Sequence, residues 1–241
     1  MTTTQRVVVM GGSSGIGEAT AAAFAADGHE VIITGRTRDK LDAAVLRIGG
    51  KTTGYQLDAG SQADIDAFFA QSGTIDHLVI SVSGSAGSGP FAELDLDHLA
   101  EGFTGKFWPQ VRILKAALPH LDSHGSVTLV TAASARAAFA GTAGLAAING
   151  ALESMVPPLA VELAPLRINA VSPGVIDTPW WDRVPEAQRQ SLFDGLAATT
   201  PVGRVGHPED IAKAIHMLAN NGFITGLVLD ATGGANLATG R

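Results

Sequence analysis

Short runs rich in β-forming residues, several of them nearly all apolar, alternate along the chain with longer stretches in which apolar residues recur at helical spacing. The short runs predict strands buried on both faces of a sheet, at residues 6–10, 30–34, 52–57, 77–81, 126–131, 167–171 and 227–229. The longer stretches predict helices at 17–26, 63–71, 99–118, 145–163 and 208–218. This alternation is typical of an α/β domain with a doubly wound, seven-stranded parallel sheet and helices on both faces.

No linker, repeat or low-complexity stretch divides the 241 residues, so a single domain covering 1–241 is predicted. The proline-containing region 172–205 is predicted to be irregular, and we expect about 175–205 to form a mobile flap over the site. Pro109 and the pair Pro157-Pro158 fall inside predicted helices. We expect a kink at Pro109 and an interruption at the pair, because proline removes a backbone hydrogen bond.

The composition argues against several classes of function. Hydrophobic residues make up 46% of the chain and charged residues 16%, which is enough for a large core. A net charge of −7 with scattered basic residues argues against a nucleic-acid surface. The absence of cysteine excludes disulfides and thiolate chemistry, and no histidine pair has metal-ligand spacing. We recognise neither a signal segment nor a membrane span, so a cytoplasmic protein without a metal is expected.

The most informative motif is a glycine-rich turn between the first predicted strand and the first predicted helix. Gly11 permits a tight turn, Gly15 lets the backbone approach a pyrophosphate, and Gly17 lets the helix pack closely on the sheet. The amides and the dipole of the following helix attract the anion. The turn therefore predicts a Rossmann-type dinucleotide site formed by Gly11, Ser13, Ser14, Gly15, Ile16 and Gly17.

The residue that follows the second predicted strand indicates which dinucleotide binds. Many NAD-binding folds carry an acidic residue there to hold the ribose 2′-hydroxyl, whereas this chain has Arg36. A guanidinium group suits a 2′-phosphate, so NADP(H) is the predicted cofactor, with Arg36 and Thr37 at its phosphate. The alternative is that Arg36 is a solvated surface residue.

Over nearly its whole length the sequence resembles the short-chain dehydrogenase/reductase family. The resemblance rests on the glycine turn and on four further segments: Leu57-Asp58-Ala59, the run from Asn169 to Pro179, Thr225-Gly226 and Gly233-Gly234. It implies that Asp58 contacts adenine, that Ile176 and Thr178 contact the nicotinamide amide, and that Ser83, Gly84, Pro173 and Gly174 complete the cofactor site. It also implies a homodimer or homotetramer that acts on a small molecule, without nucleic-acid or membrane partners.

The chain departs from the family at its four catalytic positions. The family uses Asn, Ser, Tyr and Lys, and the matching positions here hold Lys106, Ala132, Leu145 and Asn149. The family's Tyr passes a proton to the substrate carbonyl, assisted by a Lys that lowers its pKa, and Leu145 cannot do this. The only tyrosine, Tyr55, is predicted in the third strand, away from the site.

Lys106, Thr131 and Asn149 are the candidates to replace this machinery. Lys106 would bring an ammonium group into the pocket, to hold a ribose hydroxyl or to polarise a substrate oxygen; alternatively it reaches solvent or pairs with a carboxylate. Thr131, together with Ser134, borders the crevice where ligands bind in such folds. The pair Trp180-Trp181 either lines an apolar substrate pocket, or packs the flap against the body or forms a subunit contact. Six histidines are expected at the surface: His77, His98, His120, His124, His207 and His216.

Three functions therefore stay open at the level of sequence. The first is an NADP(H)-dependent oxidoreductase with a non-standard active site, acting on a carbonyl or alcohol, or on an activated C=C or C=N bond. The second is a non-catalytic NADP-binding protein that senses the cofactor or regulates a partner. The third is a non-redox enzyme on the same scaffold, because a fold does not by itself determine function.

Overall fold

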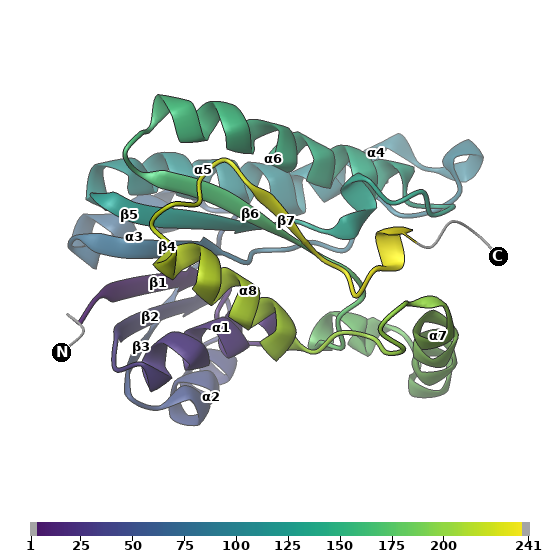
Figure 1. Ribbon diagram of the computed structural model, residues 1–241, viewed down its shortest axis with the longest axis horizontal. Coiled ribbons are helices and arrows are strands. Elements are labelled where there is room, and N and C mark those ends of the chain that lie inside the picture. The colour runs from purple at the N-terminus through teal and green to yellow at the C-terminus, as the bar shows by residue number, and fades with distance from the viewer. Residues whose placement is uncertain (1–3, 238–241) are drawn as a thin grey trace.

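The computed structural model describes residues 4–237, which form one seven-stranded sheet with helices packed on both faces (Figure 1). All strand pairs are parallel, and the order is β3-β2-β1-β4-β5-β6-β7. This confirms the predicted fold class. The strands are β1 Arg6–Met10, β2 Glu30–Gly35, β3 Lys51–Gln56, β4 Ile75–Ile80, β5 Leu121–Val130, β6 Arg167–Pro173 and β7 Val228–Ala231.

Each face of the sheet carries its own hydrophobic core. On one face, α1 Gly15–Ala26, α2 Arg38–Ile48 and α8 Pro208–Asn220 bury side chains such as Phe24, Leu41 and Ile215. On the other, α3 Gln62–Ser72, α5 Trp108–Ala117 and α6 Ala143–Glu162 bury Phe68, Ile113 and Val156. A central strand covered on both sides has no solvent face, which is why β1 is a nearly continuous apolar run, whereas the edge strand β3 is largely polar.

The strand order reverses direction at β1, and this reversal determines where a ligand crevice forms. β1 pairs with β2 on one side and with β4 on the other, with Val8 opposite both Ile32 and Leu78. The chain leaves β1 toward the face with α1 and leaves β4 toward the face with α5. A crevice forms between such diverging connections at the carboxyl ends of the strands, where ligands bind in open parallel sheets.

The segment between β6 and α8 is more regular than the predicted flap. It contains a short 3-10 helix, Pro179–Arg183, and the helix α7, Glu186–Thr199, so the prediction of an irregular 172–205 is wrong. The sequence signal was weak because α7 buries a single side chain, Phe193, and therefore lacks an apolar stripe. Figure 1 shows α7 standing apart from the helices that cover the sheet.

Two further helical details differ from the predictions. Helix α2 had not been predicted, because only Leu41 and Ala44 of its residues are buried. Pro157 and Pro158 do not interrupt α6, which continues through them to Glu162. Both prolines are exposed, while Val156 and Ala160 pack on the sheet. Water can therefore bond the carbonyls that lose their helical partners, and packing of the buried side holds the helix together.

α6 is also long and apolar enough, by length and composition alone, to cross a bilayer, contrary to the expectation that no stretch would be. In the fold it is a core helix whose buried residues pack beside β6.

The prediction that His77 lies at the surface is also wrong. His77 lies within β4, its Nδ1 is 2.9 Å from Ser126 Oγ of β5, and burial lowers its pKa to about 4. A strand in the middle of a sheet buries its polar residues together with its apolar ones.

Candidate functional site

The glycine turn connects β1 to α1 in the geometry that an anion site requires. Gly11 and Gly15 have positive φ values of 82° and 54°, which disfavour any residue with a side chain. A Cβ on Gly17 would collide with the carbonyl oxygen of Gly11, so α1 starts directly against the turn. The first amides of α1 have no partner within the helix and are available to an oxygen anion. Ser14 makes no side-chain cap that would occupy them.

Beyond the turn, the crevice opens into one continuous cavity of about 970 Å³. Thirteen of the predicted cofactor residues line it: Gly11, Ser13, Ser14, Gly15, Ile16, Arg36, Asp58, Ser83, Gly84, Pro173, Gly174, Ile176 and Thr178. Gly17 lies behind the turn, and Thr37 is the N-cap residue of α2; neither lines the cavity. Lys40, which the sequence reasoning did not select, joins Arg36 at the same end.

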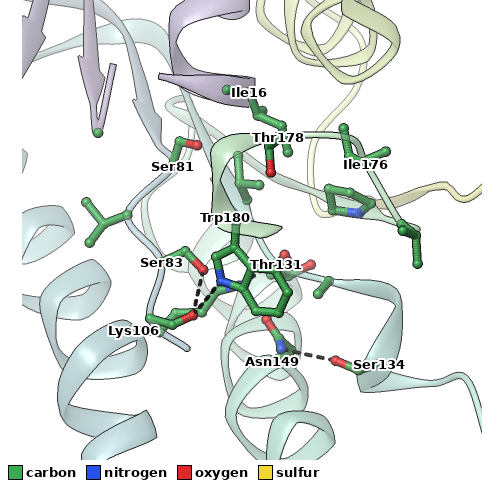
Figure 2. Close-up of a pocket in the computed structure, with 18 of the residues that line it drawn as sticks. Ile16, Ser81, Ser83, Lys106, Thr131, Ser134, Asn149, Ile176, Thr178 and Trp180 are labelled. Atoms are coloured by element: carbon green, nitrogen blue, oxygen red, sulfur yellow. Dashed lines mark hydrogen bonds between the residues drawn. The ribbon is translucent and has the colours of Figure 1, made fainter. Parts of the chain in front are cut away.

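The opposite end of the cavity holds the residues at the positions that carry catalysis in the family. Lys106, Thr131, Ala132, Leu145 and Asn149 all line it, although they come from separate segments of the chain. Figure 2 shows Lys106, Thr131 and Asn149 together with Trp180 among the residues that line this pocket. The topology thus brings together the predicted cofactor turn and the predicted catalytic positions in one space.

Lys106 reaches this space from a distorted helix. The predicted helix 99–118 is divided into α4 Leu96–Gly102, a π-helical turn Phe103–Phe107 and α5, with Pro109 in the first turn of α5. The structure shows a π turn just before Pro109, a feature that often occurs at functional sites, and the kink expected at Pro109 stays a prediction. The backbone at Gly105 packs against Gly84, where an added Cβ would lie 3.3 Å from the Gly105 carbonyl carbon. Two small residues therefore let the Lys106 segment approach the loop after β4.

The Lys106 side chain is buried, with 7% of its surface exposed. Its Nζ donates a hydrogen bond to the backbone carbonyl of Thr131 at 3.1 Å. Burial lowers the pKa of this amine to about 8, and the negative charge of Glu153 opposes that decrease. The alternative that Lys106 simply reaches solvent is therefore wrong, and the side chain carries a protonatable group at the wall of the cavity.

The hydroxyl of Thr131 is turned toward a buried carboxylate. Its Oγ1 donates to Glu153 Oε1 at 2.8 Å and lies 3.2 Å from the carbonyl of Val171. The second oxygen of Glu153 forms a salt bridge of 3.0 Å with Arg136, which also binds Asp230. Sequence reasoning missed both Glu153 and Arg136, because nothing in the local pattern marks a charge on a helix as buried.

The side-chain amide of Asn149 has one hydrogen-bonding atom without a partner among the described residues. Its Nδ2 donates to Ser134 Oγ at 3.2 Å and to the Leu145 carbonyl at 2.9 Å (Figure 2). Its Oδ1 is buried and has no hydrogen-bond partner within the described part of the chain. Because buried amide oxygens are normally paired, this atom is available to a hydroxyl or amide of a bound molecule.

The two adjacent tryptophans fix the segment after β6 to the rim of the cavity. Trp180 donates from Nε1 to the Gly84 carbonyl at 3.0 Å, and the guanidinium carbon of Arg183 lies 3.3 Å from the centre of its ring system. Trp181 donates to the Ile176 carbonyl and packs edge-on against Phe193 of α7. Both indoles line the cavity and both contact the body, so the predicted packing of this segment against the body is observed, and a role in a substrate pocket stays a prediction.

The end of the cavity that holds Lys106 is otherwise poor in acid–base groups. Among its lining residues, which all belong to the described part of the chain, there is no tyrosine, histidine or glutamate. Tyr55 lies in β3 and its hydroxyl accepts a hydrogen bond from Gln71, away from the site as predicted. Residues 4–237 contain no cluster of three or more histidine and acidic side chains that could hold a metal ion.

Comparison with known proteins identifies the family. Residues 11–236 match the family model described as enoyl-(acyl carrier protein) reductase. A short-chain dehydrogenase/reductase of Stachybotrys chlorohalonatus is 30% identical over 253 aligned residues that cover 97% of each chain. The chain belongs to the short-chain dehydrogenase/reductase family. The sequence-based recognition is thereby confirmed, and the protein is an oxidoreductase of the short-chain dehydrogenase/reductase type.

The similarity extends over whole chains. The L-fucose dehydrogenase of Mus musculus is 31% identical, with 98% of this chain and 89% of that protein covered. Among solved structures, a small-chain dehydrogenase in complex with NADPH matches with a TM-score of 0.83 and 29% identity, over 98% of this chain and 100% of that chain. Members of the short-chain dehydrogenase/reductase family use a nicotinamide cofactor, and the glycine turn and its cavity fit one here.

Proposed function

We propose that this short-chain dehydrogenase/reductase transfers hydride between NADP(H) and a small carbonyl or alcohol, using a non-standard active site centred on Lys106. The observation that carries the proposal is the continuous cavity. It joins the glycine turn to a substrate end at which Lys106 is the only titratable side chain among the described lining residues. The other charged lining residues are Arg36, Lys40 and Asp58 at the cofactor end and the mutually paired Arg204 and Asp210.

The cofactor preference rests on the charges beside β2. Arg36 and Lys40 are exposed and line the end of the cavity where the adenosine ribose would lie, with no acidic side chain at the position that selects a free 2′-hydroxyl. Arg38 instead pairs with Asp42 at 2.8 Å. Two cations around one anion support NADP(H) over NAD(H), and the solved relative with bound NADPH is consistent with this choice.

Replacing Arg36 with Gln tests this preference. We expect the Kd for NADPH to rise about 10- to 100-fold, because one charge-assisted hydrogen bond contributes about 1.5–3 kcal/mol, while the Kd for NADH changes little. Fluorescence titration of both cofactors measures the effect. Arg38→Gln is the matched control and should leave both Kd values unchanged; an equal loss for NADPH and NADH in Arg36→Gln would contradict the proposed preference.

The chemistry follows from the position of Lys106. When bound, the nicotinamide supplies or accepts hydride. The Lys106 ammonium donates a hydrogen bond to the substrate oxygen and passes it a proton as the carbonyl becomes an alcohol, the task that the family assigns to Tyr. In the alcohol-oxidation direction the neutral amine takes that proton back. The free Oδ1 of Asn149 accepts a hydrogen bond from a ribose or substrate hydroxyl.

The lining of the substrate end defines the class of substrate. Apart from Lys106 it is formed by uncharged groups, with bulky apolar contributions from Phe139, Leu145, Ile148 and Leu196 and from the indole of Trp180. A substrate carboxylate or phosphate in contact with these side chains would lose its hydration without compensation. We therefore propose a neutral, apolar aldehyde or ketone, and we include activated C=C and C=N bonds, which need less acid assistance.

Turnover assays with NADPH separate this function from its alternatives. Apolar aldehydes, ketones, imines and enones should oxidise NADPH, whereas matched substrates that carry a carboxylate should react poorly. Tight NADPH binding with no turnover on any of these compounds would favour a non-catalytic NADP-binding protein. Conversion of a substrate without a change in NADPH absorbance would favour non-redox chemistry.

We also propose a cytoplasmic homodimer or homotetramer. Helices α5 and α6 leave large apolar side chains uncovered in the isolated chain. Trp108 of α5 is 48% exposed and Val161 of α6 is 81% exposed. Covering such side chains is a common reason for self-association.

A further inference from the structure

Glu153 is a buried acid that the proposed reaction does not use directly. It lies on α6, one turn after Asn149, and only 7% of its surface is exposed. A carboxylate in such a place is costly unless it is paired and hydrogen-bonded. Here both of its oxygens are occupied, one by the Thr131 hydroxyl at 2.8 Å and the other by Arg136 at 3.0 Å.

Thr131 connects this carboxylate to the Lys106 amine. The hydroxyl of Thr131 donates to Glu153, and its backbone carbonyl accepts from Lys106 Nζ at 3.1 Å. One residue at the end of β5 thus holds a buried anion on one side and a buried cation on the other. The two charges stay apart but act on each other through a region that excludes most water.

Arg136 lies on the side of Glu153 that faces solvent and forms a salt bridge with it. Nearly half of its side chain is exposed, and it binds Glu153 through Nε and Asp230 of β7 through a second nitrogen at 2.6 Å. Glu153 is therefore fixed in position and orientation by elements from three parts of the chain. A carboxylate held this firmly keeps a constant electrostatic effect on its neighbours.

No other charged group replaces Glu153 in this role among the residues that the structure describes around Lys106. The loop after β4 contributes Ser81 and Ser83, the end of β5 contributes Thr131, the segment after β6 contributes Trp180, and α6 adds the neutral Asn149. The neighbouring α4 carries His98 and Glu101, which pair with each other on its outer side. Glu153 is the charged group that acts on the Lys106 amine, and burial is the opposing effect.

We propose that Glu153, held in place by Arg136 and Thr131, is the buried counter-charge that keeps Lys106 an ammonium ion in the substrate pocket. Glu153 is a positioning residue, since it acts through Lys106 and does not line the cavity itself. The inference deepens the proposed function, and only its consequence for turnover rests on that function. Without the counter-charge, the desolvated amine would release its proton near neutral pH and could no longer donate one to a carbonyl.

The protonation of Lys106 can be followed directly, because the chain has only five lysines. Protein grown with lysine labelled with carbon-13 at Cε gives one NMR signal for each lysine, and the signal missing from Lys106→Met identifies Lys106. In wild type we expect its titration midpoint to lie well below those of the other lysines. In Glu153→Gln the midpoint should fall by about one further pH unit or more.

The matched control is Glu162→Gln, which removes one negative charge from an exposed position on the same helix and should leave the midpoint of Lys106 unchanged. Glu153→Asp, which withdraws the carboxylate by one methylene, should give a smaller fall in the same direction and serves if the Gln variant does not fold. A midpoint in either Glu153 variant that matches the one in Glu162→Gln overturns the proposal.

Turnover gives the second measurement and separates the two proposals. If Lys106 is the proton donor, the rate of carbonyl reduction by Glu153→Gln should decline at a lower pH than in wild type, by the same interval as the NMR midpoint. A shifted midpoint with an unshifted rate profile leaves the Glu153 inference intact and rejects Lys106 as the proton donor. An unshifted midpoint rejects the Glu153 inference, whatever the rate profile shows.

Discussion

Replacing Lys106 with Met should reduce kcat for carbonyl reduction by about 10²- to 10⁴-fold, the range for loss of a general acid, while NADPH still binds. Methionine has a similar length and fills the same buried space without a proton to donate. The cofactor end of the cavity is unaffected, because Lys106 lies at the substrate end beside Thr131 and Asn149. Steady-state kinetics and fluorescence titration measure the two effects separately.

The matched control for this variant is Lys115→Met, which removes an exposed ammonium from the adjoining helix α5 and should leave kcat unchanged. The pH dependence gives an independent check. Burial lowers the pKa of Lys106 to about 8, so the ammonium form predominates below that pH and is lost as the pH rises through it. Reduction should therefore be fast below pH 8 and decline above it. A Lys106→Met protein with wild-type kcat would remove Lys106 from the mechanism.

Replacing Gly17 with Ala should nearly abolish NADPH binding. The added Cβ collides with the carbonyl oxygen of Gly11, so α1 must move away from the turn. Displacing two helix amides removes two charge-assisted hydrogen bonds of about 1.5–3 kcal/mol each, which raises the Kd about 100-fold or more. The overpacking itself should lower the free energy of unfolding by about 1–3 kcal/mol. Fluorescence titration and urea unfolding measure these two effects.

Gly150→Ala is the control for a methyl group added to a glycine. Gly150 lies within α6, and a Cβ there meets no atom within 4 Å. Because alanine favours a helix over glycine, this variant should be more stable by up to about 1 kcal/mol and should bind NADPH as wild type does. If Gly17→Ala binds NADPH as tightly as Gly150→Ala, the close contact of α1 with the turn is not needed for the cofactor.

The proposed arrangement explains how an oxidoreductase site can function with Leu145 in place of a tyrosine. A lysine amine has an ordinary pKa near that of a tyrosine hydroxyl, so either group can deliver a proton once its environment lowers that pKa. In this chain burial lowers the pKa of Lys106, and Glu153 limits the decrease. The balance leaves the amine protonated at neutral pH and still able to release a proton, which a general acid requires.

The sequence alone determined the frame of the molecule. Runs such as Val7-Val8-Val9 are apolar because strands covered on both faces bury their side chains, so all seven strands were located, with the largest error at β5, which begins at Leu121 and not at the predicted 126. Gly11, Gly15 and Gly17 were identifiable because their backbone geometry and close contacts exclude side chains. Such constraints act within a few residues of the chain and therefore leave a local pattern.

The tertiary structure alone decided the surroundings of the predicted catalytic residues. Lys106, Thr131, Arg136 and Glu153 lie on different elements, and only the parallel topology brings them together. A sequence pattern reports which face of a helix is apolar, so it gave no sign that α6 buries a carboxylate beside Thr131 and Arg136. The polar helix α7 was missed because it buries a single side chain, Phe193, and the π turn that carries Lys106 was missed because a local pattern of apolar residues does not distinguish it from an α-helix.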